Sequence, residues 1–204
     1  MNRKFGKIEN GKLVFAPSVI IDGDKQIISN DASVYLQYGY KQITREPYPQ
    51  GTEIVYKEHY VESDTTITIS WAEDLEATRQ SVLGEIAEYD TIDAVNSFTL
   101  GEVETWLNRD DRVCLMHSLE VSQLKGETTY GLCVEGVGVV TLPILAIKSM
   151  LDDIEFYAIQ CYKRTFEHKE AVNALTTCTE LVNYDYTQGY PAKLHFDIDK
   201  NTNN

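Results

Sequence analysis

The side chains best suited to catalysis are scattered along this 204-residue chain. Its histidines, His59, His117, His168 and His195, include no pair four residues apart, the spacing at which one helix face can hold a metal ion. No two of its four cysteines are two residues apart, so neither a redox pair nor a zinc knuckle is indicated. The chain also lacks a Gly-x-Ser-x-Gly nucleophile elbow and a phosphate-binding glycine loop.

Two other arrangements could do chemistry, and the sequence supports neither. Cys161 and His168 would form a nucleophile pair only if they met, but seven helical residues separate them by about 10 Å along the axis. Two carboxylates could hydrolyse a glycoside, yet no spacing singles out a pair among 32 acidic residues. Asp110-Asp111 and Asp152-Asp153 lack the alternating spacing of a calcium loop. We therefore expect no enzymatic activity, no cofactor and no metal site.

The tyrosines are more informative, because tyrosine offers a large, rigid and amphipathic surface for protein or for sugar rings. The chain has 13 of them. Those in two loop-like clusters make the candidate contact surface: Tyr184, Tyr186, Tyr190, Tyr40 and Tyr48. The alternative is that such rings close small cores with their hydroxyls bonded at the edge. We favour that alternative for Tyr157, Tyr162 and Trp106 and leave both open for the cluster at 184–191.

Charge is distributed unevenly and limits the kinds of partner. The net charge is −14, of which residues 1–71, with 8 basic and 9 acidic side chains, contribute only −1. An acidic second half cannot bind phosphates, so no nucleic-acid partner is expected. No apolar run reaches 18 residues, and the basic start leads into no apolar core, so neither a membrane span nor a signal peptide is expected. The cysteines are expected to be reduced and buried, with a single disulfide left open.

The elements that must position these residues are clearest in residues 143–175. Pro143 suits the first position of a helix, where its missing N–H is not needed. The apolar residues then recur at steps of three and four, on one stripe that must be buried: Ile144, Ile147, Leu151, Ile154, Ala158 and Cys161. Met150, Tyr157 and Tyr162 widen this stripe. The second part of the chain is expected to be built around this helix.

The first part, residues 1–71, reads as a small, hairpin-rich α+β module. Asn10-Gly11 predicts a tight hairpin. Asp31, or Asn30, can cap a helix over 32–38 that Gly39 ends. In the last strand, over 65–71, Ile67 and Ile69 share one face.

A change of apolar period near Trp71 predicts a helix over 71–89, and residues 72–96 are expected to connect the two parts. Residues 97–198 then form a mixed domain, with strands at 97–100, 103–107, 128–134 and 137–141. Asn108 can cap a helix over 109–124. A short helix over 179–184 and a strand over 193–198 close the domain, and 199–204 form a disordered tail. The fold class is α+β.

Five blocks within residues 97–196 carry a family resemblance. They are 106–112 (WLNRDDR), 139–143 (VVTLP), 154–162 (IEFYAIQCY), 168–169 (HK) and 184–194 (YDYTQGYPAKL). In order and spacing they resemble an uncharacterised domain family found at or near the C-terminus of phage and prophage tail-associated proteins. The first part looks like a short module that often precedes such domains. The chain lacks the long repetitive shaft of the commonest architecture.

The resemblance implies a structural or assembly role in a tail fibre or baseplate, through contact with a fibre or baseplate protein or with identical subunits. It implies no catalytic residues. Such a protein would occur in the bacterial cytoplasm when made from a prophage, or in the virion tail. A tail-fibre assembly chaperone and a glycan-binding module for host recognition are the alternatives.

Overall fold

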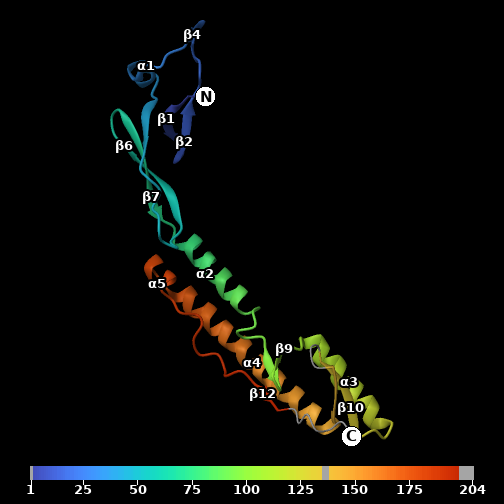
Figure 1. Ribbon diagram of the computed structural model, residues 1–204. Coiled ribbons are helices and arrows are strands. Elements are labelled where there is room, and N and C mark those ends of the chain that lie inside the picture. Colours follow the sequence, from blue (N-terminus) through green and yellow to red (C-terminus); the bar gives the residue numbers. More distant parts are fainter. Residues whose placement is uncertain (1, 135–137, 198–204) are drawn as a thin grey trace. The chain divides into compact units, whose positions relative to one another are not determined.

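The computed structural model describes residues 2–134 and 138–197 (Figure 1). Contacts divide these residues into two units. Unit 1 comprises 2–78 and 176–182, and unit 2 comprises 79–134, 138–175 and 183–197. Both units contain helices and strands, which confirms the α+β fold class. The expected tail, 199–204, lies outside the described residues.

Unit 1 is built on a five-stranded sheet with the order β2-β1-β5-β7-β6. The strands are β1 (Asn2–Glu9), β2 (Lys12–Ala16), β5 (Lys41–Arg45), β6 (Tyr56–Glu62) and β7 (Thr66–Glu73). Strands β5 and β7 run parallel, whereas the other neighbouring strands run antiparallel. The chain between β5 and β7 contains β6, which pairs with the far side of β7.

Local sequence signals account for much of unit 1. The β1–β2 hairpin turns at Asn10 and Gly11, whose φ angles of 51° and 75° are those of the type I′ turn that this pair favours. Ile67 and Ile69 are both buried on β7, so the predicted inner face of this strand is confirmed.

A small second hairpin and a short helix cover one end of unit 1. The hairpin pairs β3 (Ile20–Asp22) with β4 (Lys25–Ile27), and the helix is α1 (Ala32–Gln37). The predicted cap is confirmed, because Asp31 accepts a hydrogen bond from Ser33 N at 2.9 Å. Helix α1 stacks the buried Tyr35 on Phe5 with ring centroids 4.3 Å apart, and these rings anchor the local core.

The predicted helix over 71–89 begins later than expected. Strand β7 continues to Glu73, because Tyr56 and Glu73 are still paired across the β6–β7 ladder. Helix α2 (Leu75–Tyr89) starts after Asp74, which accepts a hydrogen bond from Ala77 N at 3.2 Å. Trp71, where the predicted strand over 65–71 and the predicted helix meet, lies on the strand, because the ladder continues to Glu73. The contacts place the border between the units inside α2, after Thr78, rather than after residue 71.

Unit 2 combines most of α2 with two small sheets and two long helices. One sheet contains β8 (Phe98–Leu100), β9 (Val103–Thr105) and β12 (His195–Phe196) in the order β12-β8-β9. The other pairs β10 (Thr129–Val134) with β11 (Gly138–Pro143). The long helices are α3 (Arg109–Leu124) and α4 (Ile144–Ala174), and α5 (Cys178–Val182) returns to unit 1.

Helix α4 has 31 residues and is the axis of unit 2. The predicted stripe is confirmed for Ile144, Ile147, Leu151, Ile154 and Cys161, which are all buried, and Ala158 is half-buried. The helix begins at Ile144, one residue later than predicted, because Pro143 is still paired with Thr129 in the β10–β11 ladder. Although α4 is long, neither it nor another helix in the described part of the chain is apolar enough to cross a membrane.

Helix α3 packs on the first half of α4 with Leu119 against Ile147 and Leu151. The predicted cap is confirmed, because Asn108 accepts a hydrogen bond from Asp111 N at 2.9 Å. The buried Arg112 ties the two helices together through Glu155, with Nη2 2.7 Å from the carboxylate.

The cysteines differ from the expectation. All four are free, which agrees with a reduced chain, but Cys114 and Cys133 are exposed, so the prediction of burial is wrong for them. Cys114 lies on the outer side of α3, because the inner side is already occupied by Leu119 and its neighbours. Cys161 and Cys178 are buried as predicted.

The two faces of α4 give a matched test of this packing. Ile154→Ala removes a fully buried side chain, and we expect it to lower the free energy of unfolding by about 2–5 kcal/mol. The control Ile159→Ala changes the same residue type on the exposed face and should cost less than about 1 kcal/mol. Urea unfolding followed by circular dichroism measures both, and equal losses would contradict this assignment of the faces.

Candidate functional site

The C-terminal tyrosine cluster is part of unit 2. Tyr184, Tyr186 and Tyr190 are each half-buried. Tyr89, at the end of α2, meets Tyr186 and Tyr190 with ring centroids 5.7 and 5.5 Å away. Each ring therefore closes a small core and keeps part of its surface outside, and the use of that outer surface for contact stays a prediction.

His168 on α4 fastens this segment and is itself almost completely buried. Its Nε2 lies 2.9 Å from the carbonyl oxygen of Gln188, and its Nδ1 lies 2.8 Å from the hydroxyl of Tyr184. A carbonyl can only accept, so Nε2 carries the proton and Nδ1 accepts from Tyr184. Burial lowers the pKa of His168 and favours this neutral form.

A second polar contact holds the segment one turn earlier along α4. The hydroxyl of Thr165 donates to Asp90 at 2.5 Å, so the hydroxyl of Tyr190, 2.9 Å away, must donate to Thr165. Arg164 Nε also donates to the carbonyl of Gln188 at 2.9 Å. Gly189 follows with a φ of 81°, which favours glycine, and a Cβ there would lie 2.6 Å from Arg164 Nε and displace the guanidinium group from Gln188.

These contacts also show whether Cys161 and His168 form a nucleophile pair. The Cys161 thiol lies 3.7 Å from the carbonyl of Val95, and burial raises its pKa. Both nitrogens of His168 are engaged with Tyr184 and Gln188. The thiol therefore lacks an adjacent base, and the arrangement serves to hold the chain together.

The two N-terminal members of the predicted surface differ from each other. Tyr40 is half-buried against Tyr35, with ring centroids 6.4 Å apart, and Lys7 lies over its ring. Tyr48 is 44% exposed and meets Trp71 edge to face at 4.8 Å. Arg45 lies over the other side of this cluster, 5.5 Å from the Trp71 ring.

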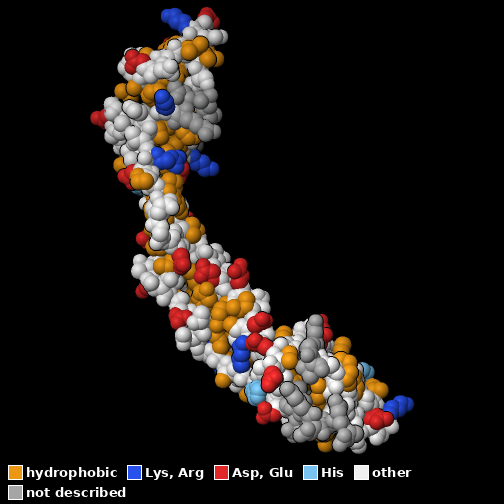
Figure 2. Space-filling view, in the orientation of Figure 1, with side chains coloured by type: hydrophobic (Ala, Val, Ile, Leu, Met, Phe, Trp, Pro, Cys, Tyr) orange, Lys and Arg blue, Asp and Glu red, His pale blue; other side chains and the backbone are white. Residues whose placement is uncertain are grey.

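The largest feature that the sequence did not identify is a row of apolar side chains on the outside of α4. It is formed by Phe156, Ile159, Tyr162 and Phe166, which are between 55% and 70% exposed, and is called the α4 outer stripe below. At about 100° per residue the four lie within about 120° of helix circumference, apart from the buried stripe. Figure 2 shows hydrophobic side chains reaching the surface in the region of α2 and α4.

Tyr162 was expected in the core and is instead 70% exposed, so that prediction is wrong. The buried face of α4 is filled by Tyr157 and Cys161, and Tyr162 lies one position beyond it. The signal for the stripe was present in the sequence, because Phe156, Ile159 and Phe166 are spaced by three and seven residues. This spacing does not single out an outer stripe in the sequence, because one buried stripe already accounts for the helix.

Charged groups beside the stripe pair with one another. Arg112 pairs with Glu155, while Lys163 and Arg164 lie 3.8 and 3.3 Å from Glu167. Asp152 and Lys163 lie in the same sector of α4 and are exposed, so the apolar side chains of the stripe are interleaved with charged ones.

Among residues 2–134 and 138–197, no three His, Cys, Asp or Glu side chains are grouped so that they could hold a metal ion. No protein-family model matches the chain, and no curated protein and no solved structure shows a significant similarity to it. Its function is therefore argued from its own residues.

The burial of His168 predicts a pH effect on stability. Because the pKa of His168 is lowered on folding, the unfolded chain binds a proton more readily, and stability is lost as the pH falls below about 6.5. His168→Gln cannot take up this proton. We expect the difference in free energy of unfolding between wild type and His168→Gln to shrink from about pH 7 to about pH 5.

Urea unfolding at both pH values measures this difference, and His117→Gln, which removes an exposed histidine from α3, is the control. A difference for His168→Gln that stays constant would mean that folding leaves the proton affinity of His168 unchanged.

Proposed function

We propose that the chain is a non-enzymatic structural or assembly protein of a phage or prophage tail, and that it acts by protein–protein contact through the α4 outer stripe. The observation that carries the contact role is the exposure of Phe156, Ile159, Tyr162 and Phe166 on one side of one helix. Exposed apolar residues are normal when single, whereas a contiguous row is typical of an interaction surface.

The energetics of such a contact are favourable. Full burial of one large apolar side chain is worth about 1.5–3 kcal/mol, so covering four side chains that are each about 60% exposed contributes roughly 1–2 kcal/mol apiece. Two phenylalanines and a tyrosine also match the aromatic composition of interface centres. The stripe lies on a helix whose opposite face is fixed in the core, so it is presented without much loss of conformational freedom.

The tail assignment rests on the five sequence blocks that resemble the tail-associated family. Two of them lie on α4, at 154–162 and 168–169, and the first includes three residues of the outer stripe. The partner is accordingly a tail fibre or baseplate protein, or an identical subunit within a fibre. The structural use of His168 and Cys161 supports a role without catalysis.

An assembly chaperone is the second candidate, because it would use the same exposed stripe for transient binding. The two candidates differ in the composition of purified particles, because a structural component is present in them and a chaperone is absent.

The aromatic cluster of unit 1 favours a third candidate, a glycan-binding module. Tyr48 is exposed beside Trp71, with Arg45 and Glu58 joined at 2.9 Å nearby. An aromatic face next to charged hydrogen-bonding groups is suited to a sugar ring.

Substitutions in the outer stripe test the proposed contact. We expect Phe156→Ser with Phe166→Ser to weaken binding to the neighbouring tail proteins, or self-association, about 100-fold, because two aromatic anchors are lost. Phenylalanine and serine have similar helix propensities, so α4 should remain folded. Pull-down of co-expressed tail proteins and light scattering over a concentration series measure the two kinds of binding.

The matched control is Val113→Ser with Leu124→Ser, which removes two exposed apolar side chains from α3. This control should bind like the wild type. If both double variants bound equally well, the α4 outer stripe would not be the contact surface.

A further inference from the structure

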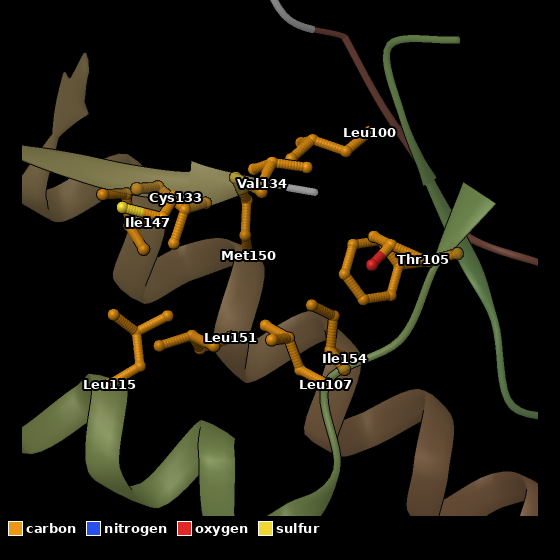
Figure 3. A pocket seen from close by; sticks show the side chains of 12 residues that line it. Leu100, Thr105, Leu107, Leu115, Cys133, Val134, Ile147, Met150, Leu151 and Ile154 are labelled. Atoms are coloured by element: carbon orange, nitrogen blue, oxygen red, sulfur yellow. The ribbon is translucent and has the colours of Figure 1, made fainter. Parts of the chain in front are cut away.

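A cavity of about 190 Å³ that is partly open to solvent lies in unit 2, between the β8–β9 hairpin, strand β10 and helices α3 and α4 (Figure 3). Cys133, which is exposed, lies at its open side. Twelve side chains line it, and ten of them are aliphatic, aromatic or thioether groups. Leu107 and Leu115 come from the start of α3 and the residues before it, while Met150, Leu151 and Ile154 come from α4. The cavity thus lies on the buried side of α4, away from the outer stripe.

This cavity is larger than an ordinary packing void, and its inner end is formed by the buried side chains of Phe98, Ile147 and Ile154. Protein interiors are packed like organic crystals and have few voids larger than a water molecule. A void also lowers stability in proportion to its volume, because the atoms around it lose contacts. An occupant would restore those contacts, so filling the cavity is favoured.

The side chains of the cavity offer water few partners. A buried water needs two to four hydrogen-bonding partners, and besides the backbone the lining provides only the hydroxyl of Thr105 and the thiol of Cys133. No charged side chain lines the cavity, so a charged molecule would lose its hydration without compensation.

The dimensions and lining define the kind of molecule that fits. A cavity of about 150 Å³ lined by Leu, Ile and Phe in another protein stays dry and binds benzene. We propose that the cavity of unit 2 is a binding site for a compact, neutral and non-polar molecule of about six to ten non-hydrogen atoms. Thr105 provides a place for one hydrogen bond, and Met150, which is flexible and polarizable, can adapt to the shape of the occupant.

The binding test uses the full chain with benzene and indole as probes. Methyl ¹³C–¹H spectra recorded over a titration report which side chains the probe meets. We expect saturable shifts confined to the methyl groups around the cavity, such as those of Leu107, Leu115 and Ile154, and a higher melting temperature with probe. No saturable shift up to the solubility limit of both probes, or shifts confined to Ile159 on the outer stripe, would overturn the proposal.

A pair of substitutions on α3 sharpens the test. Leu115→Trp places a larger side chain in the cavity and should weaken benzene binding at least tenfold. Val113→Trp is the matched control, because Val113 is exposed on the same helix, and it should bind within about twofold of the wild type. Equal binding by both variants would contradict the site. Should Leu115→Trp fail to fold, as judged by circular dichroism, Leu115→Phe takes its place.

Thr105→Val tests the polar end of the cavity with almost no change in shape. It should weaken indole, whose N–H can donate to the Thr105 hydroxyl, several-fold and leave benzene unchanged. Loss of both probes in this variant would contradict the proposed position of the hydrogen bond.

Discussion

Burial of the inner stripe of α4 is the constraint on which the rest of unit 2 depends. Each part of the unit meets a different stretch of this helix. Helix α3 packs at Ile147 and Leu151, the two small sheets pack at Ile154, and the end of α2 and the C-terminal segment meet Tyr157 and Cys161. Because the inner face of this one helix contacts the other elements of unit 2, a substitution on it affects the packing of the whole unit.

The character of this inner face changes along the helix. Its first half is aliphatic and carries the cavity, whereas its second half includes Thr165 and His168, which are buried and hydrogen-bonded. Apolar contact is tolerant of shape, while hydrogen bonds between buried groups demand one geometry. The C-terminal segment is therefore placed by direction-dependent bonds, and Gly189 allows the chain to approach Arg164 closely enough to form them.

The outer stripe and the cavity are two ways in which α4 leaves apolar surface uncovered by its own chain. The outer stripe is long, aromatic and open, which suits another folded chain. The cavity is small and set among core residues, which suits a small molecule. The two surfaces lie on different sides of one helix.

The sequence by itself determined the elements that depend on local signals. Asn10-Gly11, Asp31 and Asn108 specified a turn and two caps, and the three-to-four spacing of Ile147, Leu151 and Ile154 specified the buried face of α4. Tertiary structure decided what those signals leave open. The β6–β7 ladder extended the strand past Trp71 to Glu73, pairing with Thr129 kept Pro143 extended, and occupation of one face of α4 left Tyr162 outside. Periodicity shows that a helix has an apolar face, but only the packing of distant segments determines which of two such faces is covered.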